Sequence, residues 1–160
     1  MSEIQITRHP VRRGAFLLAT DQWFPVPRAT AFAFFGDAAN LEAITPPWLQ
    51  FEVLTPRPIE MHTGQLIDYK LRLHYFPVRW RTEISTWEPP VRFVDRQLQG
   101  PYRFWVHEHT FEEQEGGTLV RDRVEYQVPG GRLIHALLVR RDLERIFAFR
   151  RQVLERHFGS

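Results

Sequence analysis

Hydrophobic and polar residues alternate along the middle of the chain, from Trp48 to Val128. In the clearest stretch every second residue is apolar, at Ile67, Tyr69, Leu71 and Leu73. A period of two gives a β-strand one dry face and one wet face. Together with turns rich in proline and glycine, the pattern predicts six strands, at 49–55, 64–74, 76–87, 91–98, 102–113 and 117–128. Because the turns are short, we expect neighbouring strands to be antiparallel.

The two ends of the chain follow other patterns. Residues 14–24 are rich in β-forming residues and predict a first strand, which Pro25 ends. Two short helices are predicted after it, at 27–35 and 37–44. After residues 129–131, Pro-Gly-Gly, apolar residues recur every three or four positions, which predicts one long helix over 132–156. Its expected apolar stripe contains Leu133, Leu137, Val139, Leu143, Ile146, Phe147, Val153 and Leu154.

Length and composition limit the possible classes of protein. The chain has 160 residues, of which 43% are hydrophobic and 14% aromatic, so we expect one domain over 1–160 with a full core. There is no cysteine, which excludes disulfides, a thiolate nucleophile and cysteine-ligated metal sites. No apolar run approaches the roughly 20 residues of a membrane span, and no export signal is evident. We therefore expect a soluble protein of the cytoplasm with no integral membrane segment.

The charge pattern argues against a nucleic-acid partner. The formal charge is +2, and acidic residues alternate with the arginines instead of leaving a basic stripe. The sequence has no glycine-rich phosphate loop and no GxSxG or HExxH motif. We therefore expect no cofactor, and nothing in the sequence requires covalent catalysis.

Several short motifs occur in order between about Phe16 and Leu154. They include Phe32-Ala33-Phe34-Phe35, Thr45-Pro46-Pro47-Trp48-Leu49, Trp87-Glu88-Pro89-Pro90, Gly100-Pro101-Tyr102 and Trp105-x-His107-x-His109-x-Phe111. In their order and spacing the sequence resembles the SRPBCC (START/Bet v 1-like) superfamily, in particular bacterial ligand-binding proteins related to polyketide cyclases and dehydrases. The resemblance implies an α+β helix-grip fold. In that fold a curved antiparallel sheet of about seven strands wraps around a long C-terminal helix, with two short helices after the first strand and a cavity between sheet and helix.

The cavity face of each strand is expected to be its apolar face. On the last strand that face would carry Asp122 and Tyr126. Alternation alone leaves two faces open for 102–113, and the resemblance favours the face with Trp105, His107 and His109. The face of 91–98 that carries Asp95 remains ambiguous in the same way.

The candidate ligand-binding residues follow from this assignment. They are Tyr69, Trp80, Asp95, Trp105, His107, His109, Asp122, Tyr126 and Ile146. In one interpretation, the polar members orient a ligand in an apolar pocket that shifts their pKa values. In the other, they satisfy one another as a buried hydrogen-bond network. The sequence leaves both open.

Two further features have simple structural interpretations. The two histidines of His107-x-His109 lie about 7 Å apart along a strand and, with Asp95 or Asp122, have the spacing of a metal site. We nevertheless expect no metal. The arginines of the last helix could dock an acidic membrane or partner, but such a helix face is more often only solvated, and we expect them to face solvent. They are Arg140, Arg141, Arg145, Arg150 and Arg151.

Three functions fit these features. The favoured hypothesis is the binding or carriage of a small hydrophobic molecule in the cavity. The alternative is an enzyme of the polyketide cyclase, aromatase or dehydratase kind, with His107 or His109 and an aspartate as acid and base. A third is an interaction role, which similar domains have in fusions with other domains, although this chain holds no such partner domain. The residues do not decide whether a reaction is catalysed.

Overall fold

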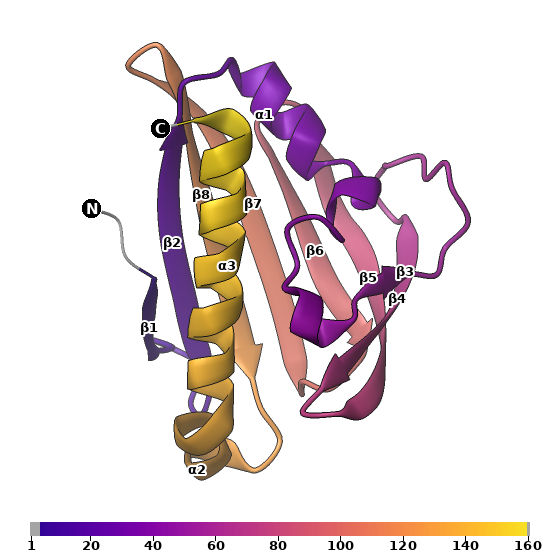
Figure 1. The fold of residues 1–160 in the computed structure, drawn as a ribbon. Helices are drawn as coiled ribbons and strands as arrows, with labels where there is room; N and C mark the ends of the chain where they lie inside the picture. Colours follow the sequence, from indigo (N-terminus) through magenta and orange to yellow (C-terminus); the bar gives the residue numbers. More distant parts are fainter. Residues whose placement is uncertain (1–3, 160) are drawn as a thin grey trace.

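A single antiparallel sheet forms the framework of the protein, in a computed structural model that describes residues 4–159 (Figure 1). Its eight strands in this range are β1 (Gln5–Arg8), β2 (Phe16–Phe24), β3 (Glu52–Val53), β4 (Leu66–Leu73), β5 (Phe76–Glu88), β6 (Arg92–Gln99), β7 (Phe104–Gln114) and β8 (Gly117–Gln127). Across the sheet the order is β1-β2-β8-β7-β6-β5-β4-β3, with every neighbouring pair antiparallel. The run β4 to β8 is therefore a series of hairpins, as the short turns predict.

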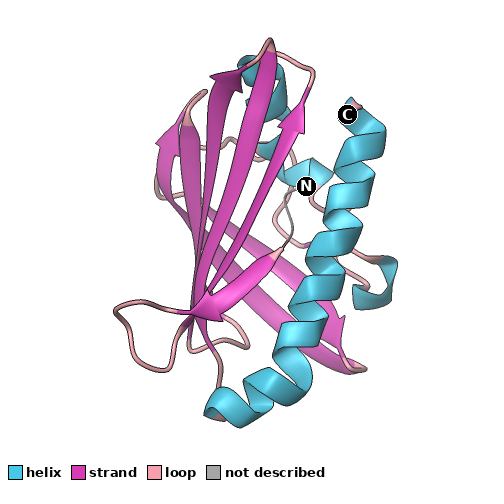
Figure 2. Cartoon of the chain, turned by 90° about the vertical axis from the view of Figure 1, so that its left-hand side faces the viewer, coloured by secondary structure: helices cyan, strands magenta, loops and turns pink. Residues whose placement is uncertain are grey.

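One long helix lies against this sheet (Figure 2). It runs without interruption through α2 (Gly131–Ile134), a π-helical turn η3 (His135–Val139) and α3 (Arg140–Phe158). The chain between β2 and β3 forms α1 (Arg28–Phe35) and two 3₁₀ turns, η1 (Ala38–Asn40) and η2 (Pro47–Leu49). The α+β class, the curved sheet and the long C-terminal helix are thus confirmed.

The structure differs from the predicted elements at three places. Strand β1 was missed because it has four residues, of which only Ile6 is buried, so no alternation marks it. The helix predicted at 37–44 is only the turn η1: Asp37 does cap it, accepting from Ala39 N at 2.9 Å, but a regular helix does not follow. The strand predicted at 49–55 shrinks to β3, because Gln50 has left-handed backbone (φ 47°) and breaks the extended run.

The apolar stripe of the long helix is only partly buried. Leu143, Phe147 and Leu154 are buried, whereas Leu133 and Leu137 are 67% and 64% exposed. The prediction was therefore wrong for the first turns of the helix. There the π-helical turn changes the spacing, and His135 faces inward, stacking on the Phe16 ring with 3.5 Å between ring centroids.

The core is divided into three hydrophobic clusters. One joins α3 to β2, β7 and β8; a second surrounds α1; a third lies against β3, β4 and β5. Side chains from all three clusters line one cavity. Within residues 4–159, no helix is both long enough and apolar enough to cross a membrane.

Candidate functional site

The cavity lies between the long helix, the α1–β3 connection and strands β4 to β7, and its volume is about 200 Å³. Most of the side chains that line it are aliphatic or aromatic. A cavity of about 150 Å³ can hold benzene, whereas sites for drug-sized molecules span about 300–1,000 Å³. The space therefore suits a small molecule of one or two rings.

The cavity wall contains seven of the nine candidate residues. They are Tyr69, Trp80, Asp95, Trp105, His107, His109 and Ile146. The structure also resolves the two strand faces that the sequence left open: Trp105, His107 and His109 point inward from β7, and Asp95 lines the cavity from β6.

Asp122 and Tyr126 do not line the cavity, which corrects the sequence-based assignment. Both are buried on β8, which packs beneath the long helix instead of facing open space (Figure 1). The Tyr126 hydroxyl hydrogen-bonds His135 Nε2 at 2.8 Å. Asp122 lies behind three residues that do line the cavity, His107, His109 and Arg150, and contacts each of them.

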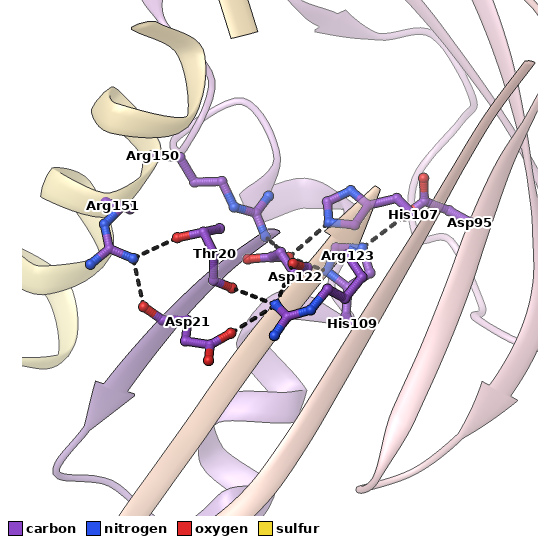
Figure 3. A network of polar contacts seen from close by, with 9 residues as sticks. All are labelled: Thr20, Asp21, Asp95, His107, His109, Asp122, Arg123, Arg150 and Arg151. Carbon is purple, nitrogen blue, oxygen red and sulfur yellow. Dashed lines mark hydrogen bonds and ion pairs between the residues drawn. The ribbon is translucent and has the colours of Figure 1, made fainter. Parts of the chain in front are cut away.

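Five polar residues beside the cavity, all buried except the partly exposed Asp95, form a connected group, here called the inner cluster (Figure 3). They are Asp95, His107, His109, Asp122 and Arg150. On the antiparallel ladder His107 lies opposite Asp95 and His109 lies opposite Asp122. The hydrogen bonds instead run diagonally: His107 Nε2 to Asp122 Oδ1 at 2.7 Å and His109 Nε2 to Asp95 Oδ2 at 2.8 Å. The two imidazole rings stack, with centroids 3.7 Å apart.

Arg150 completes the surroundings of Asp122. Its Nη2 donates to Asp122 Oδ1 at 3.2 Å, and His109 Nδ1 approaches the same oxygen at 3.1 Å as an ion pair without hydrogen-bond geometry. Burial alone would raise the pKa of Asp122, but the charge of Arg150 and the imidazole contacts outweigh it and hold that pKa well below its ordinary value. Asp122 is therefore a carboxylate at any physiological pH.

The two histidines are shifted in opposite directions. Burial and the charge of His109 lower the pKa of His107, against the effect of its bond to Asp122. Burial also acts to lower the pKa of His109, but its contacts with Asp122 and Asp95 are stronger and raise it. The pKa of Asp95 is lowered: burial, the largest single effect, acts to raise it, but the hydrogen bond from His109 and the charges of His107, His109 and Arg150 together outweigh burial. The cluster therefore holds one histidine that is charged more readily and one that stays neutral.

The sequence interpretation missed Arg150, which was expected to face solvent. It is only 9% exposed and lines the cavity. The signal was present in the helical spacing, because Arg150 lies three residues after Phe147 and four before Leu154 on the buried stripe. The sequence interpretation also missed His135. Its Nε2 forms the hydrogen bond with the Tyr126 hydroxyl, and burial lowers the pKa of His135.

Asp95, His107 and His109 could converge on one metal ion, since their ligand atoms lie within 4.8 Å of one another. The hydrogen bond between His109 and Asp95 and the bond from His107 to Asp122 account for the same geometry without an ion. The absence of a metal stays a prediction.

The site's architecture defines a class of protein. A curved antiparallel sheet closed by one long C-terminal helix over a mainly apolar cavity is the helix-grip arrangement of the SRPBCC (START/Bet v 1-like) superfamily. The family described as "Polyketide cyclase / dehydrase and lipid transport" matches residues 24–151, and the chain belongs to this family. No curated protein matches the sequence.

Solved structures support the same fold at low sequence identity. Protein CV1439 from Chromobacterium violaceum has a TM-score of 0.70 at 11% identity, over 90% of this chain and 97% of that one. Protein Ms6760 from Mycobacterium smegmatis has a TM-score of 0.67 at 14% identity, over 95% of each chain. Ginseng major latex-like protein 151 from Panax ginseng has a TM-score of 0.65 at 11% identity, over 91% of this chain and 99% of that one. At these identities the likeness concerns the fold.

Proposed function

We propose that the protein binds or carries a small hydrophobic molecule in the cavity between the sheet and the long helix. The observation that carries the proposal is the cavity itself, about 200 Å³ of space with a mainly apolar wall and one polar end. Membership in a family of cyclases, dehydrases and lipid transporters supports the same function. The proposal includes a single domain over residues 1–160, acting in the cytoplasm with neither a cofactor nor a nucleic-acid partner.

A titration with a fluorescent apolar probe tests this function. A naphthalene dye should saturate at about one molecule per chain. Ile146→Trp places an indole in the cavity from α3 and should abolish binding, whereas Ala148→Trp adds the same indole on an exposed position of α3 and should leave it unchanged. Equal binding by both variants would place the probe elsewhere and contradict the proposal.

An enzyme with acid–base chemistry is the second candidate, because the Asp122–His107 and Asp95–His109 pairs bring imidazoles to the cavity wall. Once a ligand is identified from material that copurifies with the protein, His107→Gln and His109→Gln distinguish the two functions. In an enzyme these variants lose far more turnover than affinity. In a carrier the identified molecule is recovered unchanged.

A further inference from the structure

One atom of the inner cluster remains free to meet a ligand. His107 uses Nε2 for its bond to Asp122, and within residues 4–159 its Nδ1 hydrogen-bonds no other group. The Nδ1 atom of His109 is fully buried and has no hydrogen-bond partner, whereas the Nδ1 atom of His107 is not fully buried. Because His107 is part of the cavity wall, this nitrogen is available to a molecule inside the cavity.

The neighbours of His107 decide whether Nδ1 donates or accepts. The carboxylate of Asp122 can only accept, so the hydrogen must be on His107 Nε2. A neutral imidazole with hydrogen on Nε2 has a lone pair on Nδ1. The lowered pKa of His107 keeps the ring neutral near pH 7. Nδ1 is therefore a hydrogen-bond acceptor that needs a donor from the ligand.

The charges around His107 are already balanced. Asp95 on β6 and Asp122 on β8 supply two negative charges, which Arg150 on α3 and, below its raised pKa, His109 on β7 balance. Tyr69 on β4 also faces the cavity and is neutral, because burial and the charge of Asp95 raise its pKa well above the ordinary value. A carboxylate added here would be a buried charge without a counter-ion, which is costly.

We propose that the cavity prefers apolar molecules bearing a neutral, weakly acidic hydroxyl group, a phenol or an enol, which donates its hydrogen to His107 Nδ1. This inference rests on the proposed function, because it names the ligand class of the same cavity. A hydroxyl group supplies the donor that Nδ1 lacks and adds no charge. An ether of the same shape fills the space without the hydrogen bond, and a carboxylate adds the uncompensated charge.

Three naphthalenes of similar shape test the proposal by fluorescence or calorimetric titration at pH 8. They are 2-naphthol, 2-methoxynaphthalene and 2-naphthoate. We expect 2-naphthol to bind about tenfold more tightly than the ether, the effect of one hydrogen bond, and 2-naphthoate to bind most weakly. The affinity for 2-naphthoate should rise as the pH falls through the lowered pKa of His107, because His107 can then take up a proton and compensate the added charge.

His107→Gln is the matched variant, since the glutamine amide can still donate to Asp122 but does not reproduce the Nδ1 lone pair. In this variant 2-naphthol should lose its advantage, while the affinity for 2-methoxynaphthalene should stay within twofold, which also reports that the cavity is intact. Two outcomes would overturn the inference and leave the proposed function standing. One is equal affinity of the wild-type protein for 2-naphthol and 2-methoxynaphthalene, and the other is tightest binding of 2-naphthoate at pH 8. Binding of none of the three would refute the proposed function itself.

Discussion

Two groups of polar residues lie side by side where the sheet meets α3, the inner cluster on β6, β7, β8 and α3 and an outer cluster on β2, β8 and α3, and their ion pairs differ chiefly in burial (Figure 3). Four of the five residues of the inner cluster line the cavity; Asp122 lies behind them. The outer cluster comprises Thr20, Asp21, Arg123 and Arg151. Consecutive residues are divided between the two: Asp122 is inside and Arg123 outside on β8, and Arg150 is inside and Arg151 outside on α3.

The two clusters use similar chemistry with different consequences. The Asp122 and Arg150 side chains are 8% and 11% exposed, whereas those of Asp21 and Arg123 are 33% and 34% exposed. Charges in the inner cluster are desolvated, so removing one leaves its partner stranded. Charges in the outer cluster are screened by water and contribute little. The same type of ion pair is therefore a structural requirement on one side of β8 and a minor contact on the other.

The outer cluster still positions the helix. Arg151 Nη1 donates to Thr20 Oγ1 and to the Asp21 carbonyl, both at 2.7 Å, and Gln22 Nε2 donates to the Arg151 carbonyl at 2.9 Å. These bonds tie α3 to β2 on the side away from the cavity. They hold the turn of the helix that carries Arg150 against β2.

The largest expected effect is that of Asp122→Asn. The change removes the charge that Arg150 and His109 share, so the buried Arg150 loses its counter-ion and His109 keeps only Asp95. We expect the free energy of unfolding to fall by about 3–5 kcal/mol. Chemical denaturation measures it, with Asp21→Asn as the matched control. A loss similar to that of the control would contradict the contrast between the clusters.

Arg150→Met should have the next largest effect. Methionine fills the space between Phe35 and Phe147 but leaves Asp122 without its strongest cationic partner. We expect a loss of about 2–4 kcal/mol at pH 7. Without Arg150 the pKa of Asp122 is higher than in wild type. The loss of stability should therefore shrink as the pH falls through that pKa, because a protonated Asp122 needs no counter-ion.

Arg151→Met is the control on the same helix. It removes two hydrogen bonds to β2 and should cost about 1–2 kcal/mol. A pH-independent difference between the two methionine variants would show that Arg150 acts through packing and not through charge.

The two histidines should give the stability opposite dependences on pH. The pKa of His109 is raised, so its stabilising charge is present below the unfolded value of about 6.5 and is lost as the pH rises through the folded pKa. The pKa of His107 is lowered, so its contribution is present above about 6.5 and is lost as the pH falls through the folded pKa.

Denaturation of wild type, His109→Gln and His107→Gln between pH 5 and 9 measures these contributions. The stability advantage of wild type over His109→Gln should decrease with rising pH. Its advantage over His107→Gln should increase over the same range. If both stability differences changed with pH in the same direction, the pKa values of the two histidines would not be shifted in opposite directions.

The smallest expected effect belongs to Arg123→Ala in the outer cluster. Arg123 pairs with Asp21 at 2.7 Å, but both side chains are a third exposed. We expect a loss below about 1 kcal/mol, reduced further by added salt. Denaturation at low and high ionic strength measures it, and a larger, salt-independent loss would place this pair among the buried ones.

Local pattern was sufficient to predict most of the sheet and the long helix. A period of two marks β4 to β8 and a period near 3.6 marks the helix, because each element must bury one face. The same reasoning failed for β1, where a single buried residue leaves no period, and for the first turns of the helix, where the π-helical turn changes the spacing.

The candidate site shows the same division between local and tertiary information. His107 and His109 were identifiable because alternation puts them on one face of β7, but which face turns inward depended on the rest of the sheet. For Arg150 the usual exposure of arginine predicts a surface residue, whereas its position on the apolar stripe indicates burial.

The sequence by itself determined the period of each element, the residues that share a face and the absence of cysteine chemistry, because these depend on neighbours along the chain. Only the tertiary structure decided that Asp122 lies behind the histidines and that Arg150 neutralises it. These contacts join β6, β7, β8 and α3. The residues that form them lie up to 28 positions apart in the sequence, as Asp122 and Arg150 do. Burial then fixes the charge of each group, since a pKa depends on the solvent and charges around an atom, not on its place in the sequence.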